Sequence, residues 1–327
     1  MATPGIVAGS ASGPLTNEEL EQLHRDGFVA VANVFDNASC QKFVEQELRF
    51  HLETYGNPRE QKHFATGEYD PNKHTEVPGV MLRDTNGSDP LPNQGQEWIL
   101  QNGKLVAILN QLHGSRDHWE WIHPQNVGWI HLRFPVTDAS QFEPRWHVDG
   151  GHFTPHYLTS PEQSVIVLPI LHDVDVKSGS TLVLPESHHY MAQLLHSRGA
   201  QGLQKCVTQD CRPLGRIWPI DKRDVAPLQR GDVILLHPLV VHAAGFHTNL
   251  SSQQNRITFN MGTRWTRKLS LKQPSSWLEA SLNSSLKEPT PTLKQLALSS
   301  SFKLHTPILG QRVPQDVMDA HDSFRNG

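Results

Sequence analysis

The fold class is indicated by a polar turn that runs directly into a short apolar segment, Gln229-Arg230-Gly231-Asp232-Val233-Ile234-Leu235-Leu236. A short apolar run that follows turn-forming residues is typical of a buried strand. The same pattern recurs through the second half of the chain. We therefore expect further strands at residues 127–134, 165–171, 181–184 and 257–263.

Many short strands separated by polar turns, with no helices alternating between them, favour antiparallel sheets packed as a sandwich or jelly roll. We predict a mainly β fold with flanking helices, in which residues 126–265 form a double-stranded β-helix, the jelly-roll core of cupin-like proteins. The N-terminal part, residues 15–113, is expected to be helical. The tail, residues 266–327, has weak periodicity and is expected to add helical turns that pack on the sheets.

Three helices are predicted in the N-terminal part. The first begins at the capping box Thr16-Asn17-Glu18-Glu19 and runs to His24, where Asp26-Gly27 ends it. A strand is expected at residues 28–31. The second helix begins at Asp36 and the third covers residues 97–112.

Two segments of the chain lack a periodic pattern. Residues 1–14 are predicted to be a disordered leader, which leaves residues 15–327 as a single domain. Residues 57–95 are polar and rich in Pro, Gly, Asn and Asp. A loop of this length in a compact domain is usually functional, so we predict that it forms part of a mobile lid.

Composition excludes several classes of function. The 327 residues carry a net charge of -4, so there is no basic surplus to suggest nucleic-acid binding. The longest apolar run, residues 165–171, is far too short to cross a membrane. The N-terminus lacks the charged and apolar regions of a secretion signal, and three cysteines are too few for a disulfide framework. We expect a cytoplasmic protein.

The tripeptide His147-Val148-Asp149 is the first sign of chemistry. Side chains two residues apart on an extended strand point the same way, so an imidazole and a carboxylate can converge on one ion. One further histidine would complete a 2-His-1-carboxylate triad, which holds Fe(II) and leaves positions open for co-substrate and dioxygen.

Other histidines compete for this role, because the chain contains 20. His152 and His247 lie near the candidate ligands, and His188 and His189 could bind a metal together. A zinc site from His147, Asp149 and His152 is conceivable. A continued strand would turn residue 152 to the opposite face, so we expect His152 to line the pocket instead.

Arg256 opens an otherwise apolar strand. A buried guanidinium needs a carboxylate partner, and its planar fork suits a bidentate one. The partner can be an internal Asp or Glu, which would make Arg256 structural, or the carboxylate of a bound small molecule. The strand alone leaves both readings open.

Taken together, these motifs resemble the phytanoyl-CoA dioxygenase-like (PhyH-type) iron(II)/2-oxoglutarate oxygenases over roughly residues 15–265. The matching segments appear in family order: Asp26-Gly27-Phe28-Val29, Trp146-His147-Val148-Asp149, the run from Gly179 to His188, and Gly231-Asp232 followed by His242, Gly245 and Arg256. The segment before His242 reads as a buried strand that delivers this histidine to the start of a loop.

The resemblance implies that His147, Asp149 and His242 bind Fe(II), and that Arg256 pairs with the distal carboxylate of 2-oxoglutarate. It also implies that Thr181 assists at that carboxylate and that Arg133 contacts the co-substrate's other end or the substrate. The activity implied is O2-dependent oxidation of a C–H bond in a small molecule, with release of succinate and CO2. Halogenating relatives replace the carboxylate ligand, so Asp149 favours hydroxylation.

Two rival functions remain open at this point. One is a cupin-like metalloenzyme, an isomerase or hydrolase, that does not use 2-oxoglutarate. The other is a catalytically inactive binding scaffold. The sequence departs from the family pattern at Glu186, where relatives carry Gly, which questions the shape of that turn.

Overall fold

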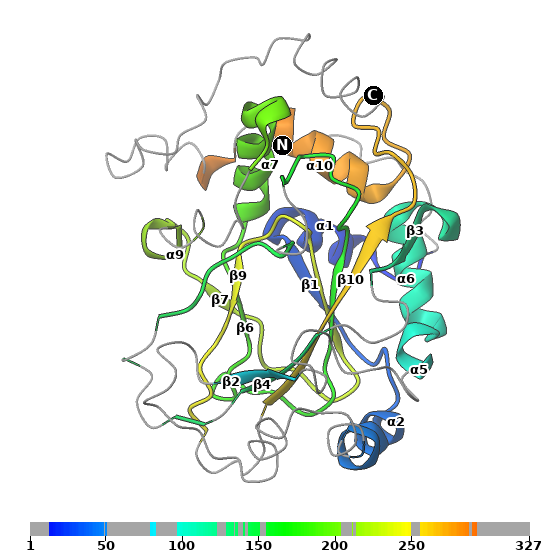
Figure 1. Ribbon diagram of the computed structural model, residues 1–327, viewed down its shortest axis with the longest axis vertical. Coiled ribbons are helices and arrows are strands. Elements are labelled where there is room, and N and C mark those ends of the chain that lie inside the picture. Colours follow the sequence, from blue (N-terminus) through cyan, green and yellow to red (C-terminus); the bar gives the residue numbers. More distant parts are fainter. Residues whose placement is uncertain are drawn as a thin grey trace.

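The computed structural model describes residues 13–48, 50, 79–82, 97–122, 129–133, 135–136, 140, 143–150, 155–203, 211, 214–249, 256–287 and 290–292. Within these residues the chain forms two antiparallel sheets with helices around them (Figure 1). None of the described helices has the length and apolar content needed to cross a membrane.

The larger described sheet has seven strands. In spatial order they are β1 (Phe28–Val31), β8 (Val233–Leu236), β5 (Ile166–Pro169), β10 (Arg256–Trp265), β4 (Trp129–Arg133) and β2 (Gly79–Leu82), and β3 (Trp119–Trp121) pairs with the far end of β10. The smaller sheet is β7 (Arg223–Asp224), β6 (Thr181–Val183) and β9 (His242–Ala244). All these pairings are antiparallel, as predicted.

The helices lie on the outside of the sheets and at one end of them (Figure 1). They are α1 (Asn17–Asp26), α2 (Asn37–Lys42), α5 (Glu97–Leu100), α6 (Gly103–His113), α7 (Ser187–Arg198), α9 (Leu214–Ile217) and α10 (Trp277–Lys287). A π-helical turn, η1 (Phe43–Glu47), continues α2, and short 3-10 turns occur at η3 (Arg116–His118) and η5 (Gly199–Gln201).

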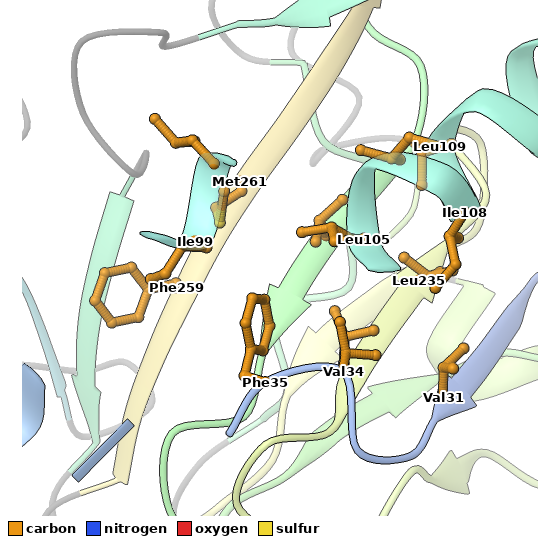
Figure 2. Close-up of a cluster of buried hydrophobic side chains, with 14 of the residues drawn as sticks. Val31, Val34, Phe35, Ile99, Leu105, Ile108, Leu109, Leu235, Phe259 and Met261 are labelled. Carbon is orange, nitrogen blue, oxygen red and sulfur yellow. The ribbon is translucent and has the colours of Figure 1, made fainter. Parts of the chain in front are cut away.

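The outer face of the larger sheet is covered by an apolar core (Figure 2). The sheet contributes Val31, Leu235, Phe259 and Met261, and α6 contributes Leu105, Ile108 and Leu109. All are almost fully buried. Burial of each such side chain stabilises the fold by roughly 1.5–3 kcal/mol.

The inner face of the larger sheet packs against the smaller sheet. Ile166, Leu168, Ile234 and Leu236 alternate with the outward-facing residues and meet Val183 of β6. Because successive side chains of a strand point to opposite faces, one strand can serve both cores. The two sheets therefore enclose a jelly-roll core of the predicted kind.

Polar side chains replace apolar ones along one part of this inner face. On β10 the outward residues Ile257, Phe259 and Met261 belong to the outer core, so Arg256, Thr258 and Asn260 point inward. Their register partners on β4 are Arg133, His131 and Trp129 respectively. A polar strip thus runs between the sheets.

The first predicted helix is confirmed and extends two residues beyond His24, to Asp26. Thr16 Oγ1 accepts a hydrogen bond from the Glu19 amide, and the Glu19 carboxylate accepts one from the Thr16 amide, which is the expected capping box. Gly27 ends the helix in the left-handed region, at φ 82°. Asp36 caps α2 as predicted.

Several predictions of local structure are wrong. The single helix predicted at residues 97–112 is two helices, α5 and α6. Asn102 lies between them: its side-chain oxygen accepts from the Leu105 amide and so caps α6, while its side-chain nitrogen donates to the Val34 carbonyl. The predicted loop 57–95 contains strand β2, and its remaining residues, the predicted lid among them, lie outside the described part. Helix α7 was not expected between the strands.

Candidate functional site

The two candidate histidines face each other across an isolated pair of backbone hydrogen bonds. The His147 amide donates to the His242 carbonyl and the His242 amide donates to the His147 carbonyl, both at 2.9 Å. Directly opposed residues of an antiparallel pair have their side chains on the same side. The ring centroids are accordingly 4.4 Å apart.

The position of His242 differs from the prediction. Strand β8 ends at Leu236, and His242 opens the next strand, β9, instead of a loop. His237 and Val240 close the tight turn between these strands, through a hydrogen bond from the Val240 amide to the His237 carbonyl. The pairing with His147, and not the end of a strand, therefore sets where this imidazole lies.

Backbone carbonyls orient both imidazoles. Nδ1 of His147 lies 2.7 Å from the Arg145 carbonyl, and Nδ1 of His242 lies 3.1 Å from the Val240 carbonyl. A carbonyl can only accept, so Nδ1 carries a proton and Nε2 is the nitrogen that remains to face Asp149 or a metal. Such contacts fix the ring tautomer at metal sites.

The Asp149 carboxylate completes the group. Its Oδ1 lies 3.2 Å from His147 Nε2 and 3.7 Å from His242 Nε2. Its other oxygen, Oδ2, accepts a hydrogen bond of 2.8 Å from the Asn260 amide of β10. Asn260 therefore turns the carboxylate so that one oxygen faces the two histidines.

The electrostatics of the group keep the carboxylate ionised. Burial opposes the charge of Asp149, but His242, His147 and Asn260 hold the pKa of its carboxyl well below the usual range. Burial also acts against a charge on His147, yet its hydrogen bond with Asp149 raises the pKa of this imidazole. Burial, with His147 nearby, lowers the pKa of His242 to about 4.

This donor set fits a divalent transition metal. One ligand atom from each of His147, Asp149 and His242 lies within 4.8 Å of the other two, and no other such group of three occurs in the described part of the chain. Two neutral imidazole nitrogens and one carboxylate oxygen form the facial set typical of non-haem Fe(II). His188, His189 and His247 join no such group, and His152 lies outside the described residues.

Arg256 lies further along the same polar strip and is buried. One guanidinium nitrogen donates to Thr181 Oγ1 at 3.2 Å, while Nε has no hydrogen-bond partner in the part of the chain that the structure describes. Within the described residues no carboxylate forms an ion pair with this guanidinium; Asp224 acts on it only from a distance. The described part of the chain therefore contains no internal ion pair that would make Arg256 structural.

Arg133 stands directly opposite Arg256 in the register of β4 and β10. Burial, together with the charge of Arg133, lowers the pKa of Arg256 to about 9. Two neighbouring cations in a buried site oppose each other, and a bound dicarboxylate would relieve that repulsion. The structure brings Arg133, Arg256 and Thr181 into one region.

Sequence reasoning missed two residues of the site. Asn260 holds the Asp149 carboxylate. His131 of β4 lies near Arg133, Asp149 and His147, and burial and the Arg133 charge lower its pKa to about 3. The signal was available in both strands, because the alternation around Arg256 and Arg133 places every second residue on the inner face.

Comparison with solved structures supports the fold. The epimerase SnoN, in complex with Fe3+, alpha ketoglutarate and nogalamycin RO, is 18% identical and gives a TM-score of 0.51 over 79% of this chain and 86% of its own. The non-heme alpha ketoglutarate dependent carbocyclase SnoK, from nogalamycin biosynthesis, is 16% identical, with a TM-score of 0.51 over 80% of this chain and 89% of its own. A comparison with curated proteins found no match.

A family model described as phytanoyl-CoA dioxygenase (PhyH) matches residues 23–257. The match spans more than half of the chain and includes the metal-binding candidates and Arg256. The chain therefore belongs to the phytanoyl-CoA dioxygenase (PhyH) family.

Proposed function

We propose that this 2-oxoglutarate-dependent non-haem iron oxygenase hydroxylates, or otherwise oxidises, a C–H bond of a small-molecule substrate. Its products would be the oxidised substrate, succinate and CO2. The observation that carries the proposal is the convergence of His147, Asp149 and His242 on one point, with a buried arginine of β10 further along the same strip.

Each residue has a defined role in this proposal. His147, Asp149 and His242 hold the iron, and Asn260 fixes the carboxylate ligand. Iron and 2-oxoglutarate, when bound, supply the activation of O2.

Arg256 would pair with the distal carboxylate of 2-oxoglutarate. Its hydrogen bond to Thr181 orients the guanidinium, and its unpartnered Nε remains available as a donor. Charge-assisted, bidentate contacts of this kind are the strong ones. Arg133, the cross-strand neighbour, would contact the other end of 2-oxoglutarate or the substrate.

Asp149 favours hydroxylation over halogenation. A halide needs a metal position that a carboxylate ligand otherwise occupies. Asn260 holds this carboxylate in place, and the two imidazoles keep it ionised. A carboxylate oxygen of Asp149 would thus occupy the metal position that a halide needs.

The two rival functions fit the site less well. A metalloenzyme that does not use 2-oxoglutarate has no need of a buried arginine that, within the described residues, has no ion-pair partner. An inactive scaffold has no need of three metal ligands oriented by backbone and side-chain hydrogen bonds. We also propose that the protein acts in the cytoplasm, which the free and buried thiol of Cys40 supports.

The test separates iron binding from co-substrate binding. Asp149→Ala should lose Fe(II) measured by titration under nitrogen. Arg256→Met should keep Fe(II) but need at least about a hundredfold more 2-oxoglutarate for succinate formation, because loss of one partner of a buried charge pair costs roughly 3–5 kcal/mol. Arg264→Met is the matched control, since Arg264 lies on the same strand in an exposed ion pair with Glu120.

Full iron occupancy in the Asp149→Ala variant would show that Asp149 is not a metal ligand. A 2-oxoglutarate requirement that is equal in Arg256→Met and Arg264→Met would show that Arg256 has a structural role. Since uncoupled succinate formation is measured, the substrate need not be known.

A further inference from the structure

A pocket opens beside the metal-ligand candidate Asp149. It encloses about 390 Å³ together with its open mouth, and its lining includes Tyr157, Gln163, Leu239 and Trp265. Leu282 of α10 closes one side. The pocket is therefore built by the 155–163 segment, the turn before β9, the end of β10 and helix α10.

Strand β10 relates this pocket to the co-substrate residues. Arg256 begins the strand, Asn260 in its middle holds Asp149, and Trp265 at its end lines the pocket. A strand rises about 3.3 Å per residue, so Asn260 and Trp265 are separated by roughly 16 Å along it. The pocket thus extends from Asp149 toward the Trp265 end of β10, the end opposite Arg256.

The lining of the pocket carries little charge. Apart from Asp149, the described residues that line it include no lysine, arginine or glutamate. The other titratable side chains in this lining are those of His156 and Tyr157. Leu239, Leu282 and Trp265 contribute apolar surface. Once Asp149 holds the metal, a charged ligand group would lose its hydration here without gaining an opposite charge from the lining.

One polar group in the pocket is buried and lacks a partner. Gln163 is 7% exposed, and its amide nitrogen Nε2 has no hydrogen-bond partner among the described residues. Buried polar groups in proteins are nearly always hydrogen-bonded, so an unpartnered one at a pocket wall needs an explanation. An acceptor atom on a bound molecule would supply the missing partner.

We propose that this pocket binds the substrate, and that the bound part of the substrate is uncharged, mainly apolar, and carries a hydrogen-bond acceptor that faces Gln163 Nε2. A ketone, ether or hydroxyl oxygen on a ring or branched hydrocarbon has this chemistry. The inference rests on the proposed function, because the pocket is taken as the substrate side of the same metal centre.

Binding of three probes of similar size tests the charge preference. Cyclohexanone, cyclohexanecarboxylate and cyclohexylammonium are titrated calorimetrically, under nitrogen, into protein loaded with Fe(II) and 2-oxoglutarate, and then into metal-free protein. We expect the ketone to bind at least tenfold more tightly than either ion. A carboxylate or ammonium probe that binds as well as the ketone would overturn the proposal.

Gln163→Leu tests the hydrogen bond. Methylenecyclohexane has the shape of cyclohexanone but no acceptor, so the ratio of the two affinities isolates the contact with Nε2. The variant should shift this ratio against the ketone by about three- to tenfold, the range of a single neutral hydrogen bond. An unchanged ratio would show that Gln163 does not contact the ligand.

Ser160→Phe tests the location of the site, since Ser160 lines the pocket and is only partly buried. The larger side chain should abolish ketone binding, whereas Thr159→Phe, one residue outside the lining, should preserve it. Circular dichroism checks that each variant folds. Equal ketone binding in the two variants would place the probe elsewhere.

These measurements do not depend on turnover. If the ketone binds as expected but no succinate forms with any metal loading, the pocket assignment stands and the proposed function fails. If succinate forms but the probes show no preference, the function stands and the pocket assignment fails.

Discussion

Asn260 shows how one side chain can control a metal centre without binding the metal. It donates to Asp149 Oδ2, so the other carboxylate oxygen faces His147 and His242. Without that contact the carboxylate could rotate about its terminal bond, because sp² side-chain torsions are broad. The amide thus reduces the freedom that metal binding would otherwise have to remove.

Asn260→Ala is expected to weaken Fe(II) binding by about ten- to hundredfold, the usual effect of removing a group that orients a ligand. A titration under nitrogen against a competing chelator measures this change. Thr258→Val is the control, because Thr258 lies on the same face of β10 and its hydroxyl makes no hydrogen bond with any described residue. Equal affinity in the two variants would mean that Asp149 is held by other contacts.

Glu186 adopts a backbone conformation that favours glycine. Its φ is 65°, in the left-handed region, immediately before α7. The shape of the turn that the family usually builds with Gly is therefore retained here, at a cost of roughly 1–2 kcal/mol for an L-residue.

Glu186→Gly should raise the free energy of unfolding by about 1 kcal/mol, as the strain disappears while glycine adds some freedom to the unfolded chain. Urea denaturation measures it. Glu186→Ala removes the same carboxylate but keeps the strain, so it should give no such gain. A gain of similar size in both variants would assign the effect to the carboxylate.

Much of the site could be predicted from single residues, but its geometry could not. The motif around His147 and the later His242 and Arg256 indicated which residues to bring together. Their convergence depends on the pairing of His147 with His242, which joins residues far apart in the chain. No local pattern encodes that register.

The elements differ in how clearly their sequence marks them. Helix α1 has a capping box and a terminal glycine, so its bounds were predicted closely. Helix α7 is buried on nearly all sides, from Ser187 to Ala192, and so lacks the apolar stripe of a surface helix. Strands β7 and β9 have only two or three residues, too few for any periodicity.

Helix α10 is anchored by a buried carboxylate. The Glu279 side chain is fully buried and accepts two hydrogen bonds from the Arg267 guanidinium, at 2.7 and 2.9 Å. The amides of Ser270 and Ser275 donate to it as well. Burial opposes its charge, but Arg267 and these amides lower the pKa of the carboxyl to about 2.

Glu279→Gln should lower the free energy of unfolding by roughly 3–5 kcal/mol, because the partly buried Arg267 loses its partner. Thermal and urea denaturation measure the loss. Glu120→Gln removes an exposed ion pair with Arg264 and should cost less than about 1 kcal/mol. Equal losses would show that α10 does not depend on this carboxylate.

At the scale of the whole molecule, four histidines, of which His24 is partly buried and the others are buried, join elements that are distant in sequence. His24 lies in the last turn of α1, His188 and His189 lie in the first turn of α7, and His237 lies in the turn after β8. The ring centroid of His188 lies 3.9 Å from that of His189 and 4.7 Å from that of His237. Ser281 and Ser285 of α10 bond to His24 and His189 respectively.

Burial lowers the pKa of every histidine in this cluster, to about 3 for His189, and neighbouring histidines lower it further for His188, His189 and His237. The folded protein therefore holds these rings neutral, whereas the unfolded chain takes up protons near pH 6.5. The unfolded state binds more protons below that pH, so the stability is fully present above about pH 6.5 and is lost as the pH falls toward the folded values.

We expect the free energy of unfolding to fall steeply between pH 6.5 and pH 5, by about 2 kcal/mol for each fully buried histidine, since each pH unit is worth about 1.4 kcal/mol. Urea denaturation at a series of pH values measures the slope. The window lies above the range in which Glu279 titrates, so that carboxylate does not contribute.

A double variant tests whether the cluster causes the slope. His188→Gln and His189→Asn place an amide near the ring nitrogens that bond the His24 carbonyl and Ser285 Oγ, but cannot titrate. The variant should lose stability at pH 8 yet show a shallower decline toward pH 5. His196→Gln, on the same helix and only partly buried, should leave the slope unchanged. Parallel curves for the wild type and the double variant would place the acid sensitivity in the other buried histidines, such as His113 and His172, whose pKa values burial also lowers.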